Sequence, residues 1–328
     1  MKLIIYMPAL NEEKYIAETI RGLPREMDGI SIIEYLVVDD GSTDQTAKIA
    51  RACGAQVISH KVNLGVGAAF QSAVRFALEQ DAVVLVGIDA DRQFDPAEIP
   101  LLVAPILDGR ADMVLGNRFH PGMPKNMPPL RYWGNQRVAK LVNSISGLNL
   151  QDVSCGFRAY SHEALLRINN FGKFTYTHET ILSLAYQQTS IVEMPISVIY
   201  YPGRKSRVAR SLWIYALQTS RIILNVLLDY QPMRVFGTFA AFCLLVGVAL
   251  VLILFTHCLL VGAFTPYKSL GFIGLGFAIF GVLSFLIALI SDMLNRIRVN
   301  QEKLLYETKK NRYKHIFRKK TGTKNEII

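Results

Sequence analysis

The stretch VGIDADRQFD, residues 86–95, decides how the rest of the chain is interpreted. An apolar run from Val83 to Ile88 leads directly into two aspartates one residue apart, Asp89 and Asp91, and Gln93 follows. A buried strand that ends in oxygen-bearing side chains places charge at the edge of a sheet, where ligands of open α/β sheets bind. The pattern of strands and helices in the rest of the sequence shows whether such a sheet is expected.

Short β-branched runs alternate with helical patterns through roughly the first 200 residues. Strands are expected at 2–8, 32–40, 55–60, 82–88 and 112–116, and helices at 12–22, 44–52, 66–79 and 96–107. Near-continuous apolar strands separated by helices predict an α/β fold with a Rossmann-like, mostly parallel sheet covered on both faces. Ligands bind beyond the carboxyl ends of such strands, which here are followed by 8–12, 39–42 and 89–93.

The D-x-D triplet formed by Asp89 and Asp91 has two interpretations. Alone, such a triplet is typical of a turn or a helix cap. Here it directly follows a buried strand, and a second strand ends in VVDDGS, residues 37–42. That position favours a divalent cation held by Asp89, Asp91 and the Gln93 side-chain carbonyl, with substrate phosphates as further ligands. Mg²⁺ or Mn²⁺ is the expected metal.

The last third of the chain contains two long uncharged runs. No Asp, Glu, Lys or Arg occurs in 235–264 or in 270–290. As helices these runs would be ~45 Å and ~32 Å long, enough to cross a hydrocarbon core of ~30 Å. Two buried helices of a soluble domain are the disfavoured alternative, because such helices normally keep a polar stripe. Since only TPYKS, residues 265–269, separates the runs, they predict a transmembrane hairpin.

Basic residues predict the orientation of this hairpin. The connecting loop carries Lys268 alone, whereas 296–320 holds ten Lys or Arg against Glu302 and Glu307, a net of +8 in a chain of formal charge +10. By the positive-inside rule both chain ends face the cytoplasm, so a multi-pass protein of the inner (plasma) membrane with a cytoplasmic N-terminal domain is expected. The lipid bilayer is therefore the expected partner of the excess charge, and a nucleic acid is not.

The amino terminus and the cysteines add two expectations. The first residues turn polar by Asn11, too early for a signal peptide. The four cysteines, Cys53, Cys155, Cys243 and Cys258, have neither metal nor disulfide spacing. They are expected to be reduced and structural.

Several motifs together resemble one known family. They are MPALNEE (7–13), VVDDGSTDQT (37–46), NLGVGAAF (63–70), DADRQFDP (89–96), GNRF (116–119) and DVSCGFRAY (152–160), in order and followed by the two apolar runs. The chain resembles the polyprenyl-phosphate glycosyltransferases, relatives of dolichol-phosphate mannose synthase within glycosyltransferase family 2. The resemblance, which is to the bacterial polyisoprenyl-phosphate glucosyltransferase type, implies a GT-A fold, a nucleotide-sugar donor, a metal at the D-x-D and a polyprenyl phosphate acceptor.

The resemblance also implies roles for individual residues. Positions that match nucleotide-sugar contacts are Pro8, Ala9, Leu10, Glu12, Val38, Asp39, Asp40, Ala90 and Arg118. Asp89, Asp91 and Gln93 match the metal and diphosphate site. Positions that match contacts to the diphosphate or the acceptor phosphate are Arg131, Arg204, Lys205 and Arg207, with Arg118 shared between the two sets. Asp152 and Glu179 match acidic positions, and Asp152 is the candidate for orienting the acceptor or acting as a base.

Some of these residues have ordinary structural interpretations as well. Glu12 can be an acid of a first helical turn, and Asp39 can be a turn residue. Arg118 and Arg131 can each be a solvated surface residue. The chain also departs from the family at two places, Arg92, where relatives usually have a small or apolar residue, and GRKSRVARS (203–211), where relatives often have Gly-x-Ser-Lys. Whether Arg92 faces a phosphate or solvent stays open, and the basic cluster as a whole is expected to act.

The stretch 211–230 predicts an amphipathic helix. Its polar residues fall near one side of a helix and are Ser211, Gln218, Arg221, Asn225 and Asp229. A narrow polar stripe flanked by basic residues favours a helix in the membrane interface. The alternative is a helix packed against a partner subunit, which would make the protein a homo-oligomer.

The expected organisation has four parts. They are a GT-A domain at 1–203, a basic linker with the interfacial helix at 204–233, the hairpin at 234–291 and a basic cytoplasmic tail at 292–328. The expected reaction is an inverting hexose transfer from UDP-glucose, since the two-helix hairpin is commonest in glucosyl-type relatives, with GDP-mannose as the alternative donor. The polyprenyl-phosphate sugar would serve cell-envelope, lipopolysaccharide or protein glycosylation.

Three other classes of protein are disfavoured. A dinucleotide-dependent oxidoreductase needs G-x-G-x-x-G after its first strand, where this chain has MPALNEE. A processive polysaccharide synthase usually has Gln-x-x-Arg-Trp and more membrane helices, and this sequence has neither. A non-enzymatic membrane scaffold or flippase partner would leave the acidic residues at the strand ends without a role, and two helices cannot enclose a pore alone.

Overall fold

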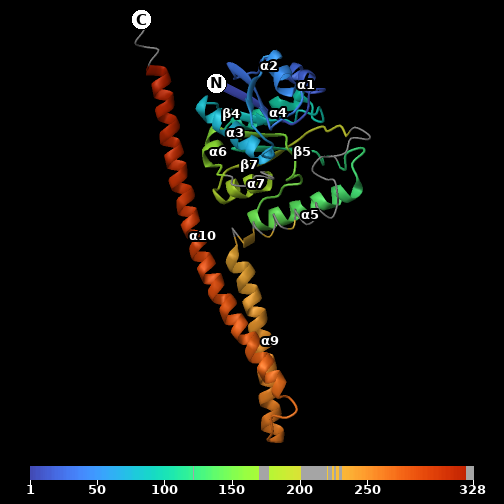
Figure 1. Ribbon diagram of the computed structural model, residues 1–328, viewed down its shortest axis with the longest axis vertical. Coiled ribbons are helices and arrows are strands. Elements are labelled where there is room, and N and C mark those ends of the chain that lie inside the picture. The colour runs from blue at the N-terminus through green and yellow to red at the C-terminus, as the bar shows by residue number, and fades with distance from the viewer. Residues whose placement is uncertain are drawn as a thin grey trace. The chain divides into compact units, whose positions relative to one another are not determined.

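The structure is a computed structural model of the 328-residue chain. It describes residues 1–120, 122–169, 177–200 and 231–322, with isolated positions at 220, 224, 227 and 228, and side chains as far as 314. The chain forms two compact units, Met1–Arg204 together with Leu305–Ile328, and Lys205–Leu304. The first unit contains the sheet, and the second contains long apolar helices (Figure 1).

One mixed sheet organises the first unit. Its strands are β1 (Lys2–Ala9), β2 (Ile32–Asp39), β3 (Gln56–Ser59), β4 (Val84–Gly87), β5 (Met113–Asn117), β6 (Arg158–Ser161) and β7 (Ile191–Pro195). The seven strands lie in the order β3-β2-β1-β4-β6-β5-β7. Strand β6 is antiparallel to β4 and β5, and the other pairs are parallel. The predicted mostly parallel GT-A sheet is confirmed, while β6 and β7 were not predicted.

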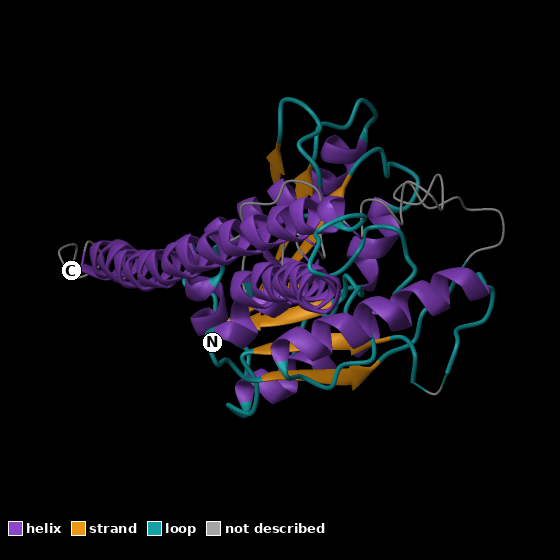
Figure 2. Ribbon diagram, turned by 90° about the horizontal axis from the view of Figure 1, so that it is seen from below, coloured by secondary structure: helices purple, strands orange, loops and turns teal. Residues whose placement is uncertain are grey.

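Helices accompany the strands in the βα order that the sequence predicts. Figure 2 shows helices in purple beside the orange strands of the sheet. They are α1 (Ile16–Gly22), α2 (Thr46–Ala52), α3 (Val66–Glu79), the 3₁₀ turn η1 (Pro96–Glu98), α4 (Ile99–Leu107), α5 (Pro129–Ser146), α6 (His162–Arg167) and α7 (Thr177–Tyr186). In β1, Ile5 belongs to a core cluster with Ile16 of α1 and Ile99 of α4. The next residue, Tyr6, has its ring 6.0 Å from that of Phe70 in α3. Because successive strand residues face opposite sides, β1 is buried on both faces, which explains its unbroken apolar run.

The end of β4 requires a glycine. A Cβ atom at Gly87 would lie 2.5 Å from the Tyr6 ring of the neighbouring strand, closer than side-chain atoms approach. The missing side chain lets β4 lie against β1 as the chain leads into Asp89. Local packing thus positions the D-x-D motif.

The described residues include two helices long and apolar enough to cross a membrane, α9 (Pro232–Val261) and α10 (Lys268–Gly322). The second unit contains α9 and the part of α10 as far as Leu304. A Cβ atom at Gly247 of α9 would lie 2.8 Å from both the Gly274 carbonyl oxygen and the Ala278 nitrogen of α10. Such close backbone approach through small residues is typical of paired membrane helices. The predicted pair of long apolar C-terminal helices is confirmed. The first ends slightly earlier than its apolar run, because Gly262 caps it in the left-handed conformation.

The stretch expected as a basic cytoplasmic tail, 292–328, is helical as far as Gly322. Within the first unit, the Tyr306 hydroxyl donates to Glu163 of α6 at 3.2 Å, and the Lys309 ammonium donates to the Ile168 carbonyl at 2.6 Å. This part of α10 therefore has protein partners as well as the charge expected to attract lipid headgroups. The predicted interfacial helix, 211–230, lies almost entirely outside the described residues.

Candidate active site

Three parallel strand ends meet at one edge of the sheet. Strands β2, β1 and β4 are neighbours, with Ala9 opposite Asp39 and Tyr6 opposite Gly87. The Asp40 amide extends the ladder by donating to the Ala9 carbonyl at 2.9 Å. The structure therefore brings together the three stretches that the strand-end rule selected, 8–12, 39–42 and 89–93.

The turns after β1 and β2 are tied to each other. The Asn11 side-chain oxygen accepts the Thr43 amide at 2.8 Å, and the Asn11 amide donates to the Ser42 hydroxyl at 2.9 Å. The Glu12 amide donates to the Thr46 hydroxyl at 2.8 Å, and Glu12 is itself buried. These bonds fix the predicted nucleotide-contacting turn Pro8–Leu10 against the end of β2. Three of the predicted contact residues are buried: Ala9, Val38 and Ala90.

The adjacent aspartates of β2 have different surroundings. Asp39 accepts the Ser42 amide at 3.0 Å within its own turn. Asp40 accepts the amides of Leu64 at 3.0 Å and Gly65 at 2.8 Å, from the loop that precedes α3. Asp40 thus holds a neighbouring loop in place.

His60 contacts both Asp40 and α3. The His60 Nδ1 atom lies 2.7 Å from the Asp40 carboxylate, and Nε2 lies 3.0 Å from the Ser72 hydroxyl of α3. This Ser-His-Asp chain resembles a catalytic triad in composition only, because Ser72 is buried inside α3. Its evident effect is to link the end of β2 to α3.

The carboxylates of the D-x-D motif lie at the carboxyl end of β4, and both residues are partly buried. Gly156 faces Asp89, since a Cβ atom there would lie 3.3 Å from both carboxylate oxygens. The glycine of the CGFR sequence therefore leaves the space beside Asp89 that any other residue would fill. One oxygen of Asp91 accepts the Gln93 amide at 3.1 Å, which orients the second carboxylate.

Arg92, between these residues, projects toward α1. Its guanidinium pairs with Glu18 at 2.7 Å, and both side chains are largely exposed. Its backbone has φ +62, so the chain turns sharply between Asp91 and Gln93. This contact answers the question that the sequence left open, since Arg92 has a surface partner on α1.

The residues present fit a divalent cation with few protein ligands. Among the residues that the structure describes, no group of three or more His, Cys, Asp or Glu side chains could hold a metal. Two carboxylates, with the Gln93 amide oxygen close by in sequence, suit Mg²⁺ or Mn²⁺, which keep coordination positions for phosphate and water. The space kept by Gly156 beside Asp89 agrees with that arrangement.

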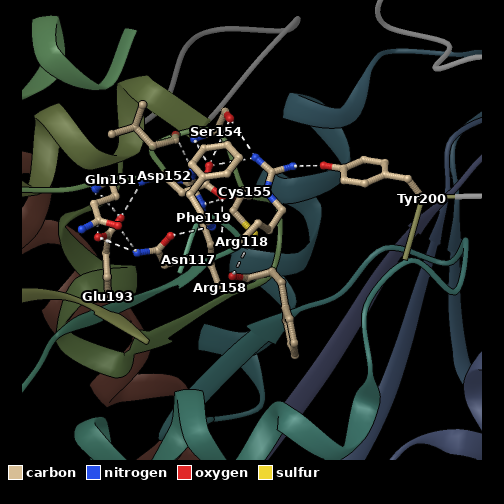
Figure 3. Close-up of polar contacts among 12 residues, drawn as sticks. Asn117, Arg118, Phe119, Gln151, Asp152, Ser154, Cys155, Arg158, Glu193 and Tyr200 are labelled. Carbon is tan, nitrogen blue, oxygen red and sulfur yellow. Dashed lines mark hydrogen bonds and ion pairs between the residues drawn. The ribbon is translucent and has the colours of Figure 1, made fainter. Parts of the chain in front are cut away.

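A buried ion pair occupies the other side of the candidate site. Arg118 follows β5, and its guanidinium grips Asp152 through Nε–Oδ2 at 2.6 Å and Nη2–Oδ1 at 2.8 Å (Figure 3). The same guanidinium donates to Ser154 at 2.9 Å and to the Tyr200 hydroxyl at 3.3 Å. These four bonds use four of the five N–H groups of an arginine.

The pair is charged in the folded protein. Burial alone would raise the pKa of Asp152, but the Arg118 charge and hydrogen bonds from Arg118 and Ser154 outweigh it and lower that pKa. Burial likewise opposes the charge of Arg118, yet Asp152 holds the pKa of Arg118 well above its usual value. Because its pKa is lowered, Asp152 is a weak base, and this fully buried carboxylate is paired with Arg118.

Strand β7 supports the backbone of this pair. The Glu193 carboxylate accepts the amides of Gln151 at 2.9 Å and Asp152 at 2.7 Å. Burial raises the pKa of Glu193, although these hydrogen bonds act in the opposite direction. A second arginine, Arg158 of β6, is fully buried and donates to the carbonyls of Val153 and Thr177, both at 2.8 Å. Arg158 thereby ties the loop before β6 to the first residue of α7.

Some of the remaining predicted residues lie in described helices, and the others lie outside the described residues. Arg131 lies in the first turn of α5, and its guanidinium carbon is 5.8 Å from the centroid of the Tyr200 ring. Glu179 lies in the first turn of α7. The basic cluster Arg204, Lys205 and Arg207 lies outside the described residues.

Sequence reasoning missed several residues that shape the site. They are His60, Ser154, Gly156, Glu193 and Tyr200. Gly156 and Ser154 lie within the quoted DVSCGFRAY motif, so that motif was the available signal. Tyr200 is 82 positions from its partner Arg118, and no local pattern marks it.

The profile of Glycosyl transferase family 2 matches residues 4–168 of the chain. The chain belongs to glycosyltransferase family 2. The match spans β1 to α6. It therefore includes the carboxylate edge, that is, the aspartates Asp39, Asp40, Asp89 and Asp91 at the strand ends, and the Arg118–Asp152 pair. The protein is accordingly a glycosyltransferase, as the sequence predicted.

Two relatives indicate the branch of this family. The chain is 33% identical over 194 residues to a dolichyl-phosphate hexose transferase of Haloferax volcanii, covering 59% of this chain and 81% of the relative. It is 29% identical over 209 residues to an undecaprenyl-phosphate mannosyltransferase of Micrococcus luteus, covering 61% and 84%. The predicted resemblance to the polyprenyl-phosphate glycosyltransferases is confirmed by these relatives.

A solved structure confirms the GT-A fold. The chain superposes on glucosyl-3-phosphoglycerate synthase of Mycobacterium tuberculosis with a TM-score of 0.53 and 22% identity, covering 70% of this chain and 79% of that one. That protein was crystallised with Mn²⁺, uridine diphosphate and glucosyl-3-phosphoglycerate. At this identity the likeness concerns the fold alone.

Proposed function

We propose that the protein transfers a hexose from a nucleotide sugar to a polyprenyl phosphate, with inversion at the anomeric carbon. The observation that carries the proposal is the pair of carboxylates, Asp89 and Asp91, at the edge where β1, β2 and β4 end together. The names of the two relatives support the acceptor class. UDP-glucose is the first proposed donor, and GDP-mannose is the second, favoured by the mannosyltransferase relative.

The donor is proposed to bind along the strand ends. Its nucleotide would contact the residues that the family resemblance selected: Pro8, Ala9, Leu10, Glu12, Val38, Asp39, Asp40 and Ala90. Asp40 would contribute indirectly, because its carboxylate accepts amides of the loop before α3. Arg118 would meet the donor through the one Nη1–H group that its bonds to Asp152, Ser154 and Tyr200 do not use.

Asp89, Asp91 and Gln93 are the residues that would hold Mg²⁺ or Mn²⁺. The bound cation would supply charge stabilisation of the departing nucleoside diphosphate. The carboxylate edge cannot receive a diphosphate favourably without such a positive charge, because like charges repel in a partly buried site.

The acceptor phosphate is proposed to meet Arg131 and the basic cluster Arg204, Lys205 and Arg207. An oxygen of this phosphate attacks the anomeric carbon, the bond from that carbon to the diphosphate oxygen breaks, and the nucleoside diphosphate leaves with the bonding electrons. A phosphate monoester has a second pKa of about 6, so most of it carries an unprotonated oxygen near neutral pH. The reaction then depends more on holding two anions together than on removing a proton.

Asp152 is proposed to act through Arg118. The sequence made it a candidate for orienting the acceptor or acting as a base. Both of its oxygens are engaged by a buried guanidinium, and its lowered pKa makes it a poor proton acceptor. Its proposed role is therefore to hold and orient Arg118 at the end of β5.

The protein is proposed to reside in the inner (plasma) membrane with its catalytic domain on the cytoplasmic side. The two apolar helices and the +8 stretch 296–320, in the C-terminal part of α10, support this orientation. In a variant without native cysteines, Lys310→Cys should react with an impermeant maleimide only from the cytoplasmic side, and Lys268→Cys only from outside. The opposite pattern would reverse the proposed topology.

The deciding experiment is a donor screen with purified protein, undecaprenyl phosphate, Mn²⁺ and radiolabelled nucleotide sugars. Label should pass from UDP-glucose or, failing that, GDP-mannose into an organic-soluble product. The matched control is Asp91→Asn, which should lose nearly all transfer, as should wild type treated with a chelator. Transfer to no lipid phosphate from any nucleotide hexose would refute the proposed acceptor, and undiminished transfer with chelator would refute the metal.

A further inference from the structure

Tyr200 lies where the chain passes the loop that carries the D-x-D motif and Gln93. After β7 the chain runs beside that loop, with the Ile199 amide donating to the Gln93 carbonyl at 2.9 Å. Phe94 and Val198 form an antiparallel bridge beside this bond. The residue after Ile199 is therefore fixed relative to Gln93 by backbone bonding.

Side-chain contacts strengthen the same junction. The Glu98 carboxylate accepts the Ser197 amide with both oxygens, at 2.9 and 3.0 Å. Asp95 caps η1 by accepting the Ala97 amide at 2.9 Å, so the turn that presents Glu98 is itself fixed. The segment from Ser197 to Tyr200 and the loop after the D-x-D motif thus behave as one local structure.

From this position Tyr200 contacts two arginines of the candidate site, Arg118 and Arg131. Its hydroxyl accepts an N–H of Arg118 at 3.3 Å, and its ring lies 5.8 Å from the Arg131 guanidinium carbon. Tyr200 is packed with Phe119 and Met127 and the residue is only 9% exposed, so the orientation of its ring is restricted. A tyrosine has the two properties that this position uses, an aromatic face for one cation and a hydroxyl for the other.

The two arginines reach Tyr200 in different electrostatic states. The charge of Arg118 is balanced by Asp152, and the Tyr200 hydroxyl holds the edge of the guanidinium that Asp152 does not contact. For Arg131 the contact is the ring face, which attracts a cation without neutralising it. An arginine held in this way keeps its charge for an anionic ligand.

We propose that Tyr200 is a positioning residue that fixes Arg118 and Arg131 relative to the Gln93 loop, through its hydroxyl and its ring respectively. The inference rests on the proposed function, in which Arg118 meets the donor and Arg131 meets the acceptor phosphate. The hydroxyl therefore serves the donor side, and the ring serves the acceptor side. One residue sets the distance between the two anions that must react.

Two substitutions separate these roles. Tyr200→Phe keeps the ring and removes the hydroxyl, so the donor KM should rise or kcat should fall by about tenfold, the effect of one hydrogen bond to a charged group. The acceptor KM should be unchanged. Tyr200→Leu also removes the aromatic face, and the KM for undecaprenyl phosphate should rise by a further factor of about three to ten. The matched control, Tyr35→Phe, removes a hydroxyl that donates to the Pro24 carbonyl at 3.0 Å on the far part of β2 and should change neither KM.

A second measurement does not require sugar transfer. Modification of Arg131 by phenylglyoxal, followed by mass spectrometry, should be faster in Tyr200→Leu than in wild type, Tyr200→Phe or the Tyr35→Phe control. Faster Arg131 modification with no wild-type transfer would refute the proposed function and keep the positioning role. An equal KM for undecaprenyl phosphate in Tyr200→Phe and Tyr200→Leu, or unchanged Arg131 modification in Tyr200→Leu, would overturn the inference even if wild type transfers sugar.

Discussion

Arg118 and Asp152, which are 34 positions apart in sequence, form a two-point ion pair inside the first unit. Asp152 is fully buried, and its carboxylate also receives the Ser154 amide at 3.2 Å. The pair connects the end of β5 to the loop before β6, which faces the D-x-D motif through Gly156. A charge pair in this position links the stability of the fold to the geometry of the candidate site.

Asp152→Asn should destabilise the protein by about 3–5 kcal/mol, because it leaves the Arg118 charge buried without a counter-charge. Urea unfolding of purified protein in detergent measures this loss. The double variant Asp152→Asn with Arg118→Met should be less destabilised than the sum of the two single variants, since the second change removes the stranded charge. Additive losses would show that the two side chains do not depend on each other.

The pH dependence of stability should come first from His178 as the solution is acidified. Burial, helped by the Arg158 charge, lowers the pKa of this histidine from 6.5 to about 4. The unfolded chain therefore binds a proton between these pH values and the folded protein does not, so stability falls as the pH drops from 6.5 toward 4. The total loss from this residue is at most about 3 kcal/mol.

His178→Leu should flatten the stability curve in that window, whatever its effect on stability at pH 7. Asp152 acts in a different window, because its folded pKa is lowered. Its contribution is complete above its unfolded pKa of about 4 and is lost as the pH falls through the folded pKa. Unfolding free energies measured at several pH values check both statements, and an unchanged slope in His178→Leu between pH 4 and 6.5 would contradict the first.

Gly247→Ala should weaken the packing of α9 against α10. The new Cβ atom would lie 2.8 Å from backbone atoms of Gly274 and Ala278, so the helices must separate. Overpacking of this kind costs about 1–3 kcal/mol. The matched control is Gly276→Ala in α10, whose new Cβ atom would meet nothing within 4 Å. Thermal unfolding in detergent should show a lower midpoint for Gly247→Ala alone, and equal midpoints for the two variants would disprove close helix contact at Gly247.

Strands β1, β2, β4 and β5 could be predicted because each is an apolar run closed by polar or turn residues, and β3 (QVIS) because Val57 and Ile58 are β-branched. Strand β6 is four residues long and begins with Arg158, which is fully buried but polar, so it has no apolar pattern. Strand β7 is only partly buried, as expected for the edge strand of the sheet. Neither has the composition that marks a central parallel strand.

The candidate site divides in the same way. The carboxylate edge could be predicted, since Asp39 and Asp89 directly follow their strands and parallel strands end together. The partners of Asp152 could not, because Arg118 and Tyr200 reach it or its neighbour from distant segments. Sequence spacing carries no signal for such contacts, and only the folded chain assigns Asp152 a permanent cation.

The contrast between Asp39 and Asp40 yields the last prediction. Asp40→Asn replaces one acceptor oxygen by an N–H₂ group, so an amide of Leu64 or Gly65, or the ring of His60, loses its acceptor. The loop before α3 should then open more often, and hydrogen exchange at Leu64 and Gly65 should accelerate by about tenfold, the effect of one lost hydrogen bond.

Asp39→Asn is the matched variant, because the Asp39 carboxylate accepts the Ser42 amide within its own turn. It should raise the donor KM without accelerating exchange at Leu64 and Gly65, whereas Asp40→Asn should do both. His60→Phe, which removes the link to Ser72, should resemble Asp40→Asn more weakly. Exchange at Leu64 and Gly65 that responds equally to Asp39→Asn and Asp40→Asn would mean that the two aspartates share one role at the end of β2.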